Sequence, residues 1–440
     1  MEAKLLCVGD IHLGRRPTRL PEDLGAVRSA ELSPAAAWKQ SVKRALELEV
    51  DAVLLAGDVV ESLDDRFAAY AVLETGVRQL VAEGIEVFGV SGNHDGEALP
   101  RLADRIDGFR LLGRGGRWDR ALIEREHKPR IQLYGWSFPG RTAKVSPLES
   151  FSFTPHPECV SIGLLHGDLD ASSSPYAPVR RSALEQLPLD AWLLGHVHKP
   201  DRLEQMRRPI GYLGSLSPLD PGEPGARGPW LARVRGPGSV VMEQLALAPL
   251  RYERMEISVE SFQADDREQA EEWLVSHILA AFAARHEQIR PELETTKLVL
   301  CRIVLQGRCR AHRLIAQSIQ DETRAVLLAR VQRHFEAARF VVEKIEDHAE
   351  PAIDLDELAG QTDLPGLLAS KLVEIRDETE RGVRLIEATR SALEAENRRS
   401  TWAGLGQIEA IDVRGLLLKA GLSALEELLA QRAPERVVVS

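Results

Sequence analysis

Cysteine is scarce in this sequence, and long apolar runs are missing from it. The four cysteines, Cys7, Cys159, Cys301 and Cys309, are scattered and do not form the close pairs of a structural zinc site. They are typical of reduced cysteines that fill the core of a cytoplasmic protein. No uncharged apolar run reaches the ~18 residues that a membrane span needs, and the opening MEAKLLCVGD has no basic segment before an apolar stretch. We therefore expect neither export nor membrane insertion, and a cytoplasmic location.

An overall excess of positive charge is also missing. The chain has 56 basic and 67 acidic residues, a formal net charge of -11. Residues 1–250 carry 30 basic and 33 acidic side chains, and residues 251–440 carry 26 and 34, so most of the acidic excess is C-terminal. No general field would attract nucleic acid to this chain, and such binding would require local basic patches and bound cations.

The length and the composition indicate a soluble globular protein of several domains. Hydrophobic residues make up 44% of the 440 residues and charged residues 28%. A chain of this length is expected to form roughly two or three domains.

Short apolar runs alternate with helical patterns in the first half of the chain. Apolar runs at 4–9, 51–58 and 85–90 are separated by helical spacing of apolar residues at 36–48 and 70–81. This alternation predicts βαβ units and a parallel sheet. In such sheets, ligands bind beyond the carboxyl ends of the strands.

Polar side chains that can bind a metal or carry a proton follow five of the apolar runs, including two later ones at 160–168 and 191–200. They are Asp10, His12, Asp58, Asn93, His94, His166, His196 and His198. Taken singly, an aspartate after a strand is usually a turn former or a helix cap, and a lone histidine is usually a surface or core residue. Chance explains the whole set poorly. Carboxylate, imidazole and amide oxygen together suit manganese, iron or zinc.

Five motifs carry a family resemblance. In chain order they are GDIHLG, GDVVES, SGNHD, LLHGD and GHVHKP. They resemble the motifs of the calcineurin-like metallophosphoesterases, and with YLGSLSPLD at 212–220 they are most similar to the SbcD-type DNA repair nucleases. The resemblance covers residues 4–220 and implies an α/β fold, a metallophosphoesterase β-sandwich flanked by helices. A small α/β cap domain and a C-terminal helical segment would follow.

The resemblance implies a two-metal site and a DNA nuclease. The activity would be that of an exonuclease with possible endonuclease activity, in the processing of DNA double-strand breaks or hairpins. Asp10, His12 and His198 would hold one divalent ion; Asn93, His166 and His196 would hold the other; and Asp58 would bridge them. Two cations roughly 3.5–4 Å apart can clamp a phosphate and generate a bridging hydroxide nucleophile, and Mn²⁺ is the ion we expect.

The loop at 90–97 would also supply catalytic groups. His94 would protonate or stabilise the leaving oxygen, and Asp95 would either orient a histidine or cap the loop. Gly92 would let the backbone turn sharply beside them. The second motif departs from many relatives, because Val60 and Glu61 replace an aromatic residue and a following histidine or aspartate. Where relatives use that histidine to contact phosphate, this chain has a carboxylate.

Arginine clusters offer weaker evidence for DNA contact. The cluster of Arg15, Arg16 and Arg19 follows the first motif and is the one we expect to bind phosphate. Further small clusters lie at 114–117, 180–181 and 207–208. Each cluster has a plainer explanation, namely that arginine is the preferred surface cation of this chain.

The composition changes after about residue 250. Strand-like segments at 251–260, 297–307 and 338–347 alternate with helical patterns at 267–286 and 311–335. We therefore expect a nuclease domain at 1–250 and an α/β cap domain at 251–350, which by resemblance helps to orient DNA. Residues 351–440 form a helical segment that either packs on its own chain or docks on the coiled coil of an SMC-like ATPase. The resemblance also leaves a homodimer open.

Two other functions use the same motifs. The chain could be a metal-dependent phosphatase or phosphodiesterase of small or protein substrates, although such an enzyme needs neither the cap unit nor the helical tail. It could also be a non-catalytic scaffold, which the complete ligand set and the intact His94 disfavour.

Overall fold

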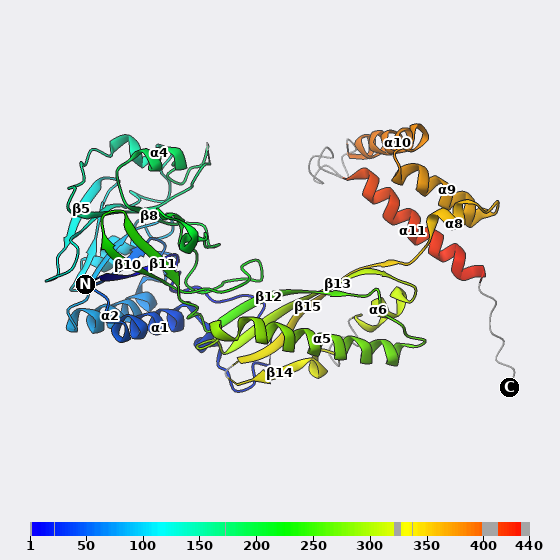
Figure 1. Cartoon of the computed structure of the whole chain (residues 1–440), viewed down its shortest axis with the longest axis horizontal. Coiled ribbons are helices and arrows are strands. Elements are labelled where there is room, and N and C mark those ends of the chain that lie inside the picture. Colours follow the sequence, from blue (N-terminus) through cyan, green and yellow to red (C-terminus); the bar gives the residue numbers. More distant parts are fainter. Residues whose placement is uncertain are drawn as a thin grey trace. The chain divides into compact units, whose positions relative to one another are not determined.

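A computed structural model describes residues 2–21, 23–171, 173–320, 327–336, 338–397 and 412–432. The chain divides into two compact units (Figure 1). One comprises Met1–Met255, Ser276–Ile303 and Leu328–Ile345; the other comprises Glu256–Val275, Val304–Leu327 and Glu346–Ser440. The expected domain boundaries at 250 and 350 stay predictions.

The first unit contains a six-stranded sheet in the order β11-β10-β1-β2-β3-β4. Strands β1 to β4 are parallel, and β10 and β11 add an antiparallel edge. The strands are β1 (Ala3–Val8), β2 (Ala52–Ala56), β3 (Glu86–Val90), β4 (Phe109–Leu111), β10 (Trp230–Gly236) and β11 (Ser239–Gln244). Every residue of β2 is buried, which is typical of parallel strands covered on both faces.

A five-stranded sheet in the order β5-β6-β7-β8-β9 forms the second layer. Strands β6 to β9 are parallel, and β5 pairs with β6 in the antiparallel direction. The strands are β5 (Trp118–Ile123), β6 (Ile131–Trp136), β7 (Val160–His166), β8 (Ala191–Gly195) and β9 (Ile210–Tyr212). The short helix α4 (Arg181–Gln186) precedes β8.

Two apolar cores hold these layers together. Side chains from both sheets, such as Leu54 and Phe88 with Leu133 and Leu164, form one buried cluster. The other cluster packs the first sheet against α1 (Pro34–Glu47), α2 (Arg66–Ala82) and α3 (Ala98–Ala103). These layers confirm the predicted β-sandwich flanked by helices and the predicted helices at 36–48 and 70–81.

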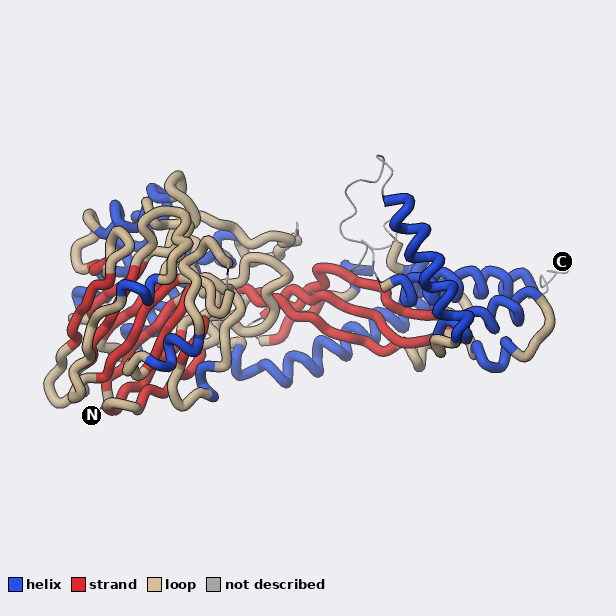
Figure 2. The backbone as a smooth tube through the Cα atoms, turned by 90° about the horizontal axis from the view of Figure 1, so that it is seen from above, coloured by secondary structure: helices blue, strands red, loops and turns tan. Residues whose placement is uncertain are grey.

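A four-stranded sheet in the order β12-β13-β15-β14 follows in the chain. Figure 2 shows its strands lying side by side with helix α5 along them. The elements are β12 (Leu250–Ser258), α5 (Arg267–Ile289), β13 (Leu298–Cys309), β14 (Gln332–Phe335) and β15 (Ala338–Pro351). The three predicted strands and the first predicted helix are confirmed.

The prediction of one helix over 311–335 is wrong in its last part. Helix α6 runs only from His312 to Ser318, and Gln332–Phe335 forms β14, which pairs with β15 in an antiparallel hairpin. Phe335 also stacks on His286 with ring centroids 4.3 Å apart. Pairing and aromatic packing therefore override the helical pattern. Residues 321–326 lie outside the described residues.

The C-terminal part is helical, as predicted. Its helices are α8 (Leu355–Ala359), α9 (Leu364–Arg376), α10 (Glu380–Asn397) and α11 (Val413–Arg432). Ala369 and Leu372 of α9 pack with Leu425 of α11 in a small buried cluster. The predicted helical segment spans residues 351–440, of which residues 398–411 and 433–440 lie outside the described part. None of the helices that the structure describes is both long and apolar enough to cross a membrane.

Candidate metal centre

The polar side chains that follow β1, β2, β3, β7 and β8 meet at one edge of the sandwich. Parallel pairing of β1, β2 and β3, and of β7 with β8, puts the carboxyl ends of these strands together. Nε2 of His12 lies 3.0 Å from Nε2 of His198. The structure brings together the seven residues that the sequence predicts as ligands.

Asp10, His12 and His198 form the first group, whose candidate ligand atoms lie within 4.8 Å of one another. Nδ1 of His12 donates to Glu61 Oε2 at 2.6 Å, and Nδ1 of His198 donates to Glu223 Oε1 at 2.7 Å. An ionised carboxylate can only accept, so in a neutral ring each Nε2 carries the lone pair that a metal ion would take.

The surroundings of Asp10 also indicate that the first group can bind a metal ion. Its carboxylate is buried, and Oδ2 has no hydrogen-bond partner among the described residues. Its Oδ1 accepts from the backbone N–H of His196 at 2.9 Å. A buried, unpaired carboxylate oxygen beside two imidazole lone pairs is costly unless a cation lies between them. These three donors therefore fit a divalent metal.

Asp58, His166 and His196 form the second group, with Asn93 beside them. Asn93 Oδ1 lies 3.0 Å from Nε2 of His166 and 3.0 Å from Nδ1 of His196. Nδ1 of His166 donates to the Ala56 carbonyl at 3.0 Å, which leaves Nε2 facing oxygen atoms. Burial lowers the pKa of His166, but the Asp58 carboxylate outweighs it and raises the pKa to about 9. The site thus attracts positive charge, and its donors fit a second metal.

Asp58 lies between the two groups. Its Oδ2 is 3.3 Å from Nε2 of His166 and 4.0 Å from Nε2 of His12. Burial raises the pKa of Asp58, but His166 and then His12 outweigh burial and lower it. The carboxylate therefore stays ionised between both sets of ligands, as a bridging ligand requires.

Glycines give the ligands room. Gly57, with φ of 91°, adopts a conformation that other residues rarely adopt, and a Cβ there would lie 2.6 Å from Nδ1 of His166. Gly92 has no positive φ, so the expected sharp turn is not what it provides. A Cβ on Gly92 would overlap Asp58 Oδ1 and lie 2.7 Å from Cε1 of His166. This glycine is needed for close packing of the ligands.

His94 and Asp95 are neighbours with different surroundings. The His94 side chain is 38% exposed, and its ring meets that of His12 edge-on at 5.1 Å. Asp95 is fully buried, and its carboxylate accepts from the backbone N–H of Gly92 at 2.7 Å and of Val59 at 2.7 Å. Burial, and then the Asp58 carboxylate, raise the pKa of Asp95 to about 7. Of its two interpretations, these bonds favour the loop cap.

Three further carboxylates touch the ligand histidines, and sequence reasoning assigned none of them this role. Glu61 and Glu223 bind His12 and His198, and Asp168 Oδ1 lies 3.2 Å from Nε2 of His196. Asp168 belongs to the LLHGD motif, so its position could have marked it. Glu223 follows the 212–220 stretch by three residues, and no periodicity marks it.

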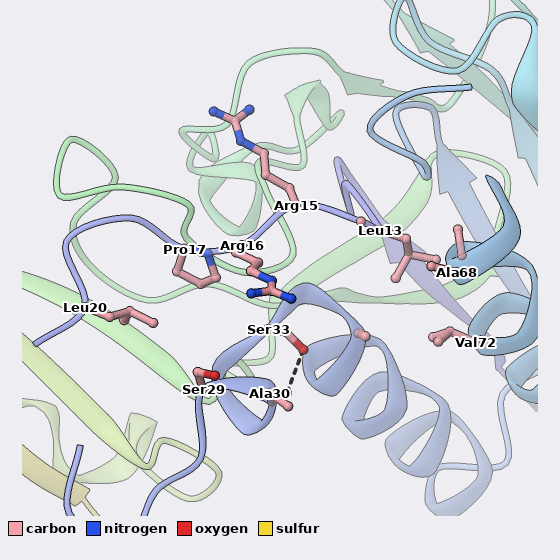
Figure 3. A pocket seen from close by; sticks show the side chains of 13 residues that line it. Leu13, Arg15, Arg16, Pro17, Leu20, Ser29, Ala30, Ser33, Ala68 and Val72 are labelled. Carbon is pink, nitrogen blue, oxygen red and sulfur yellow. Dashed lines mark hydrogen bonds between the residues drawn. The ribbon is translucent and has the colours of Figure 1, made fainter. Parts of the chain in front are cut away.

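The first arginine cluster adjoins the centre. Nη1 of Arg15 lies 3.8 Å from Glu61 Oε1, and Arg19 is exposed with φ of 58°. Figure 3 shows the Arg16 guanidinium directed toward Ser33, within a pocket of about 460 Å³ that both Arg15 and Arg16 line.

In each of the other clusters one arginine has a structural partner: Arg114 pairs with Asp104 at 2.6 Å, and Arg181 and Arg208 donate to backbone carbonyls. The first cluster differs in adjoining the candidate metal centre through Arg15, and it is therefore the best candidate for substrate contact.

Comparisons with known proteins find sequence similarity over about half of the chain. The family model of the calcineurin-like phosphoesterases matches residues 3–200. The uncharacterized metallophosphoesterase YhaO of Bacillus subtilis is 27% identical over 49% of this chain and 53% of its own length. The DNA double-strand break repair protein Mre11 of Methanopyrus kandleri is 25% identical over 48% of this chain and 48% of its own. The chain thus spans about half the length of these curated relatives.

Solved structures also resemble part of this chain. A dimetal phosphatase from Danio rerio aligns with 55% of this chain and 98% of its own at 13% identity, with a TM-score of 0.33. A likeness this weak says nothing about activity.

Proposed function

We propose that this chain, whose residues 3–200 match the family model of the calcineurin-like phosphoesterases, is a two-metal nuclease that hydrolyses the phosphodiester bonds of DNA. The observation that carries the metal dependence is the pair of ligand groups that share Asp58. The proposed roles are exonuclease, with endonuclease activity, in the processing of double-strand breaks or hairpins.

The proposed ligand residues form two sets, one for each ion. Asp10, His12 and His198 would hold one ion, and Asn93, His166 and His196 the other, with Asp58 between them; we propose Mn²⁺ for both. When bound, two such ions polarise a phosphate and activate a water molecule for attack. The buried carboxylates and imidazoles are already held by hydrogen bonds, which limits the reorganisation that binding requires.

His94 is the proposed proton donor to the leaving oxygen. Its ring is partly exposed next to the first ligand group, and its Nδ1 lies 3.2 Å from the Glu61 carbonyl oxygen. If Nδ1 donates to this carbonyl, Nε2 is turned toward the side where a phosphate would approach. General acid catalysis by a residue placed in this way contributes about 10²–10⁴-fold.

DNA is the proposed substrate because of the relatives and the local charge. Three of the curated relatives are named DNA double-strand break repair protein Mre11. Arg15 and Arg16 place two guanidinium groups beside the centre of a chain whose net charge is -11. Local arginines can neutralise backbone phosphates even when the whole chain is acidic.

An SMC-like ATPase is the proposed partner of the C-terminal helices. Leu364 and Leu367 of α9 are 62% and 59% exposed, and apolar side chains on one helix favour helix docking. All four cysteines are buried and free, which suits a reducing compartment, and we propose the cytoplasm. A homodimer also belongs to this proposal.

One experiment separates the three functions. The full chain would be incubated with Mn²⁺ and either linear double-stranded or hairpin DNA, beside p-nitrophenyl phosphate mono- and diesters. We expect DNA cleavage that stops when EDTA is added. Cleavage of the monoester with DNA left intact would favour a phosphatase, and no cleavage of any substrate would favour a scaffold.

A further inference from the structure

We infer that Glu61 is a positioning residue that aims the ligand nitrogen of His12, and that Glu223 does the same for His198. The ion held by Asp10, His12 and His198 would then depend on two carboxylates that are not ligands themselves. This inference rests on the metal centre of the proposed function and gives position 61 a role that its family resemblance does not predict.

Glu61 is held in register with the loop that carries His12. The backbone N–H groups of Ile11 and His12 both donate to the Asp58 carbonyl, at 3.0 and 2.9 Å. The Glu61 N–H in turn donates to the Leu13 carbonyl at 3.1 Å. Because these bonds join the two loops on both sides of the histidine, the carboxylate of Glu61 and the ring of His12 share one rigid frame.

Glu223 is just as firmly placed. Its Oε2 accepts from the hydroxyl of Ser215 at 3.0 Å and from the Leu219 N–H at 3.2 Å, while Oε1 accepts from His198. The position of the carboxylate is therefore set by Ser215 and Leu219, and its remaining oxygen is directed at His198.

The second ligand group is supported differently. Nδ1 of His166 donates to the neutral Ala56 carbonyl, and His196 contacts Asp168 at 3.2 Å. Among the described residues, neither Glu61 nor Glu223 makes a hydrogen bond or ion pair with His166 or His196. A carboxylate behind a ligand histidine fixes its tautomer and makes it more basic, and its loss typically weakens the metal by about 10–100-fold. Loss of Glu61 should therefore weaken one ion and spare the other.

Glu61 also lies close to two side chains outside the ligand groups. Glu61 Oε1 is 3.8 Å from Nη1 of Arg15 and 3.8 Å from Nδ1 of His94. Its other oxygen, Oε2, is on His12. A carboxylate oriented in this way supports a ligand, whereas a histidine at this position in relatives is expected to contact phosphate. A histidine introduced here would lose that support, so Glu61→His should not restore a missing catalytic group.

The test measures Mn²⁺ binding to the full-length chain without DNA, by isothermal titration and by electron paramagnetic resonance. The variants are Glu61→Ala, Glu61→Gln and Glu223→Ala, with Glu97→Gln as the control. Glu97 is exposed in the same loop as His94, and among the described residues it makes no hydrogen bond to a ligand histidine. We expect Glu61→Ala to weaken one of two ions about 10–100-fold, Glu61→Gln to weaken it less, and Glu97→Gln to match the wild type.

The results of these titrations separate failure of the inference from failure of the proposed function. Two ions bound to Glu61→Ala as tightly as to the wild type would overturn the inference, as would an equal loss of both. Glu61→Gln keeps the size of the side chain and an acceptor oxygen, so it decides the question if thermal melting shows that the alanine variant does not fold. A wild-type chain that binds no Mn²⁺ would refute the proposed metal centre instead. A chain that binds two ions without cutting DNA would refute only the substrate.

Discussion

At the scale of single residues, His94 differs from its neighbours in being open to solvent. Among the proposed ligands, Asp10, His12 and His166 are almost fully buried and the His196 and His198 side chains are 17% and 24% exposed, whereas the His94 side chain is 38% exposed. A group that protonates a leaving oxygen has to reach the substrate, and a group that only coordinates can stay buried. Exposure therefore separates the proposed chemistry of His94 from coordination.

His94→Ala should abolish most DNA cleavage while both metals remain bound. The variant loses the proton donor but none of the atoms in the two ligand groups around Asp58, so we expect a rate lower by about 10²–10⁴-fold. Single-turnover cleavage and Mn²⁺ titration measure the two quantities separately. An equal loss of bound metal in this variant would overturn the assignment.

Asp58→Ala should weaken both ions together. Its Oδ2 lies near a histidine of each ligand group, so its removal takes one negative charge from both sites. We expect isothermal titration to show lower affinity for two ions, in contrast with the single ion affected in Glu61→Ala. A metal content equal to that of the wild type would rule out the bridge.

At the scale of secondary-structure elements, the carboxyl ends of the strands set the precision of the site. The loop after β3 is held from inside by Asp95, which accepts backbone hydrogen bonds from Gly92, Val59 and Val60. Those residues belong to the loops after both β2 and β3. The carboxylate therefore joins two loops that carry Asp58 and Asn93, and a strand end without such a cap would hold its ligands less rigidly.

Gly92→Ala should disturb the metal centre although Gly92 carries no functional group. The added methyl would overlap Asp58 Oδ1 and approach His166, so either the carboxylate or the loop must move. We expect a loss of about 1–3 kcal/mol in unfolding free energy and weaker Mn²⁺ binding. Urea denaturation and titration measure these effects. Gly140→Ala is the matched control, because Gly140 also lacks a positive φ and a Cβ there meets nothing within 4 Å.

Helix α9 offers a separate test of the partner. The double variant Leu364→Glu and Leu367→Glu puts charge on two exposed apolar positions, so it should prevent docking of a coiled coil while DNA cleavage stays unchanged. Co-purification of the chain with an SMC-like ATPase from the same source measures the first effect. Val241→Glu, at a 50% exposed valine of β11, is the matched control. Retained co-purification would show that the partner binds elsewhere.

At the scale of the whole molecule, the net charge of the chain and the local charge near the candidate metal centre have opposite effects on DNA binding. The net charge of -11 repels DNA, while Arg15 and Arg16 adjoin the metal centre. Bound cations would add positive charge at the same place. DNA affinity should therefore depend on both metal and salt.

Arg15→Ala with Arg16→Ala should lower DNA affinity and make it less sensitive to salt. Each lost phosphate contact should reduce the slope of log affinity against log salt by about 1. Fluorescence anisotropy over a salt series with a noncleavable DNA measures this slope. Arg114→Ala, which removes a guanidinium already paired with Asp104, should leave it unchanged. An unaltered slope in the double variant would exclude these arginines from the interface.

Much of the part that holds the candidate metal centre could be predicted from the sequence. Buried parallel strands read as continuous apolar runs, and their carboxyl ends converge in any such sheet. The parallel strands and the positions of Asp10, Asp58 and His166 therefore followed from local pattern, whereas the sandwich was implied by the family resemblance. The helix expected over 311–335 shows the limit, because the pairing of β14 with β15 is a contact that its local periodicity does not contain.

The sequence by itself thus determined which residues could bind metal, because residue type and position at a strand end are local properties. Only the tertiary structure decided which carboxylates form hydrogen bonds with the candidate ligand histidines. Glu223 reaches His198 across 25 positions of the chain, and Glu61 reaches His12 across 49. The physical reason is that a hydrogen bond depends on the separation of two atoms in space, which the fold of loops distant in sequence sets. For that reason Glu61, which in the sequence is only a departure from the motif, becomes in the structure the support of a ligand.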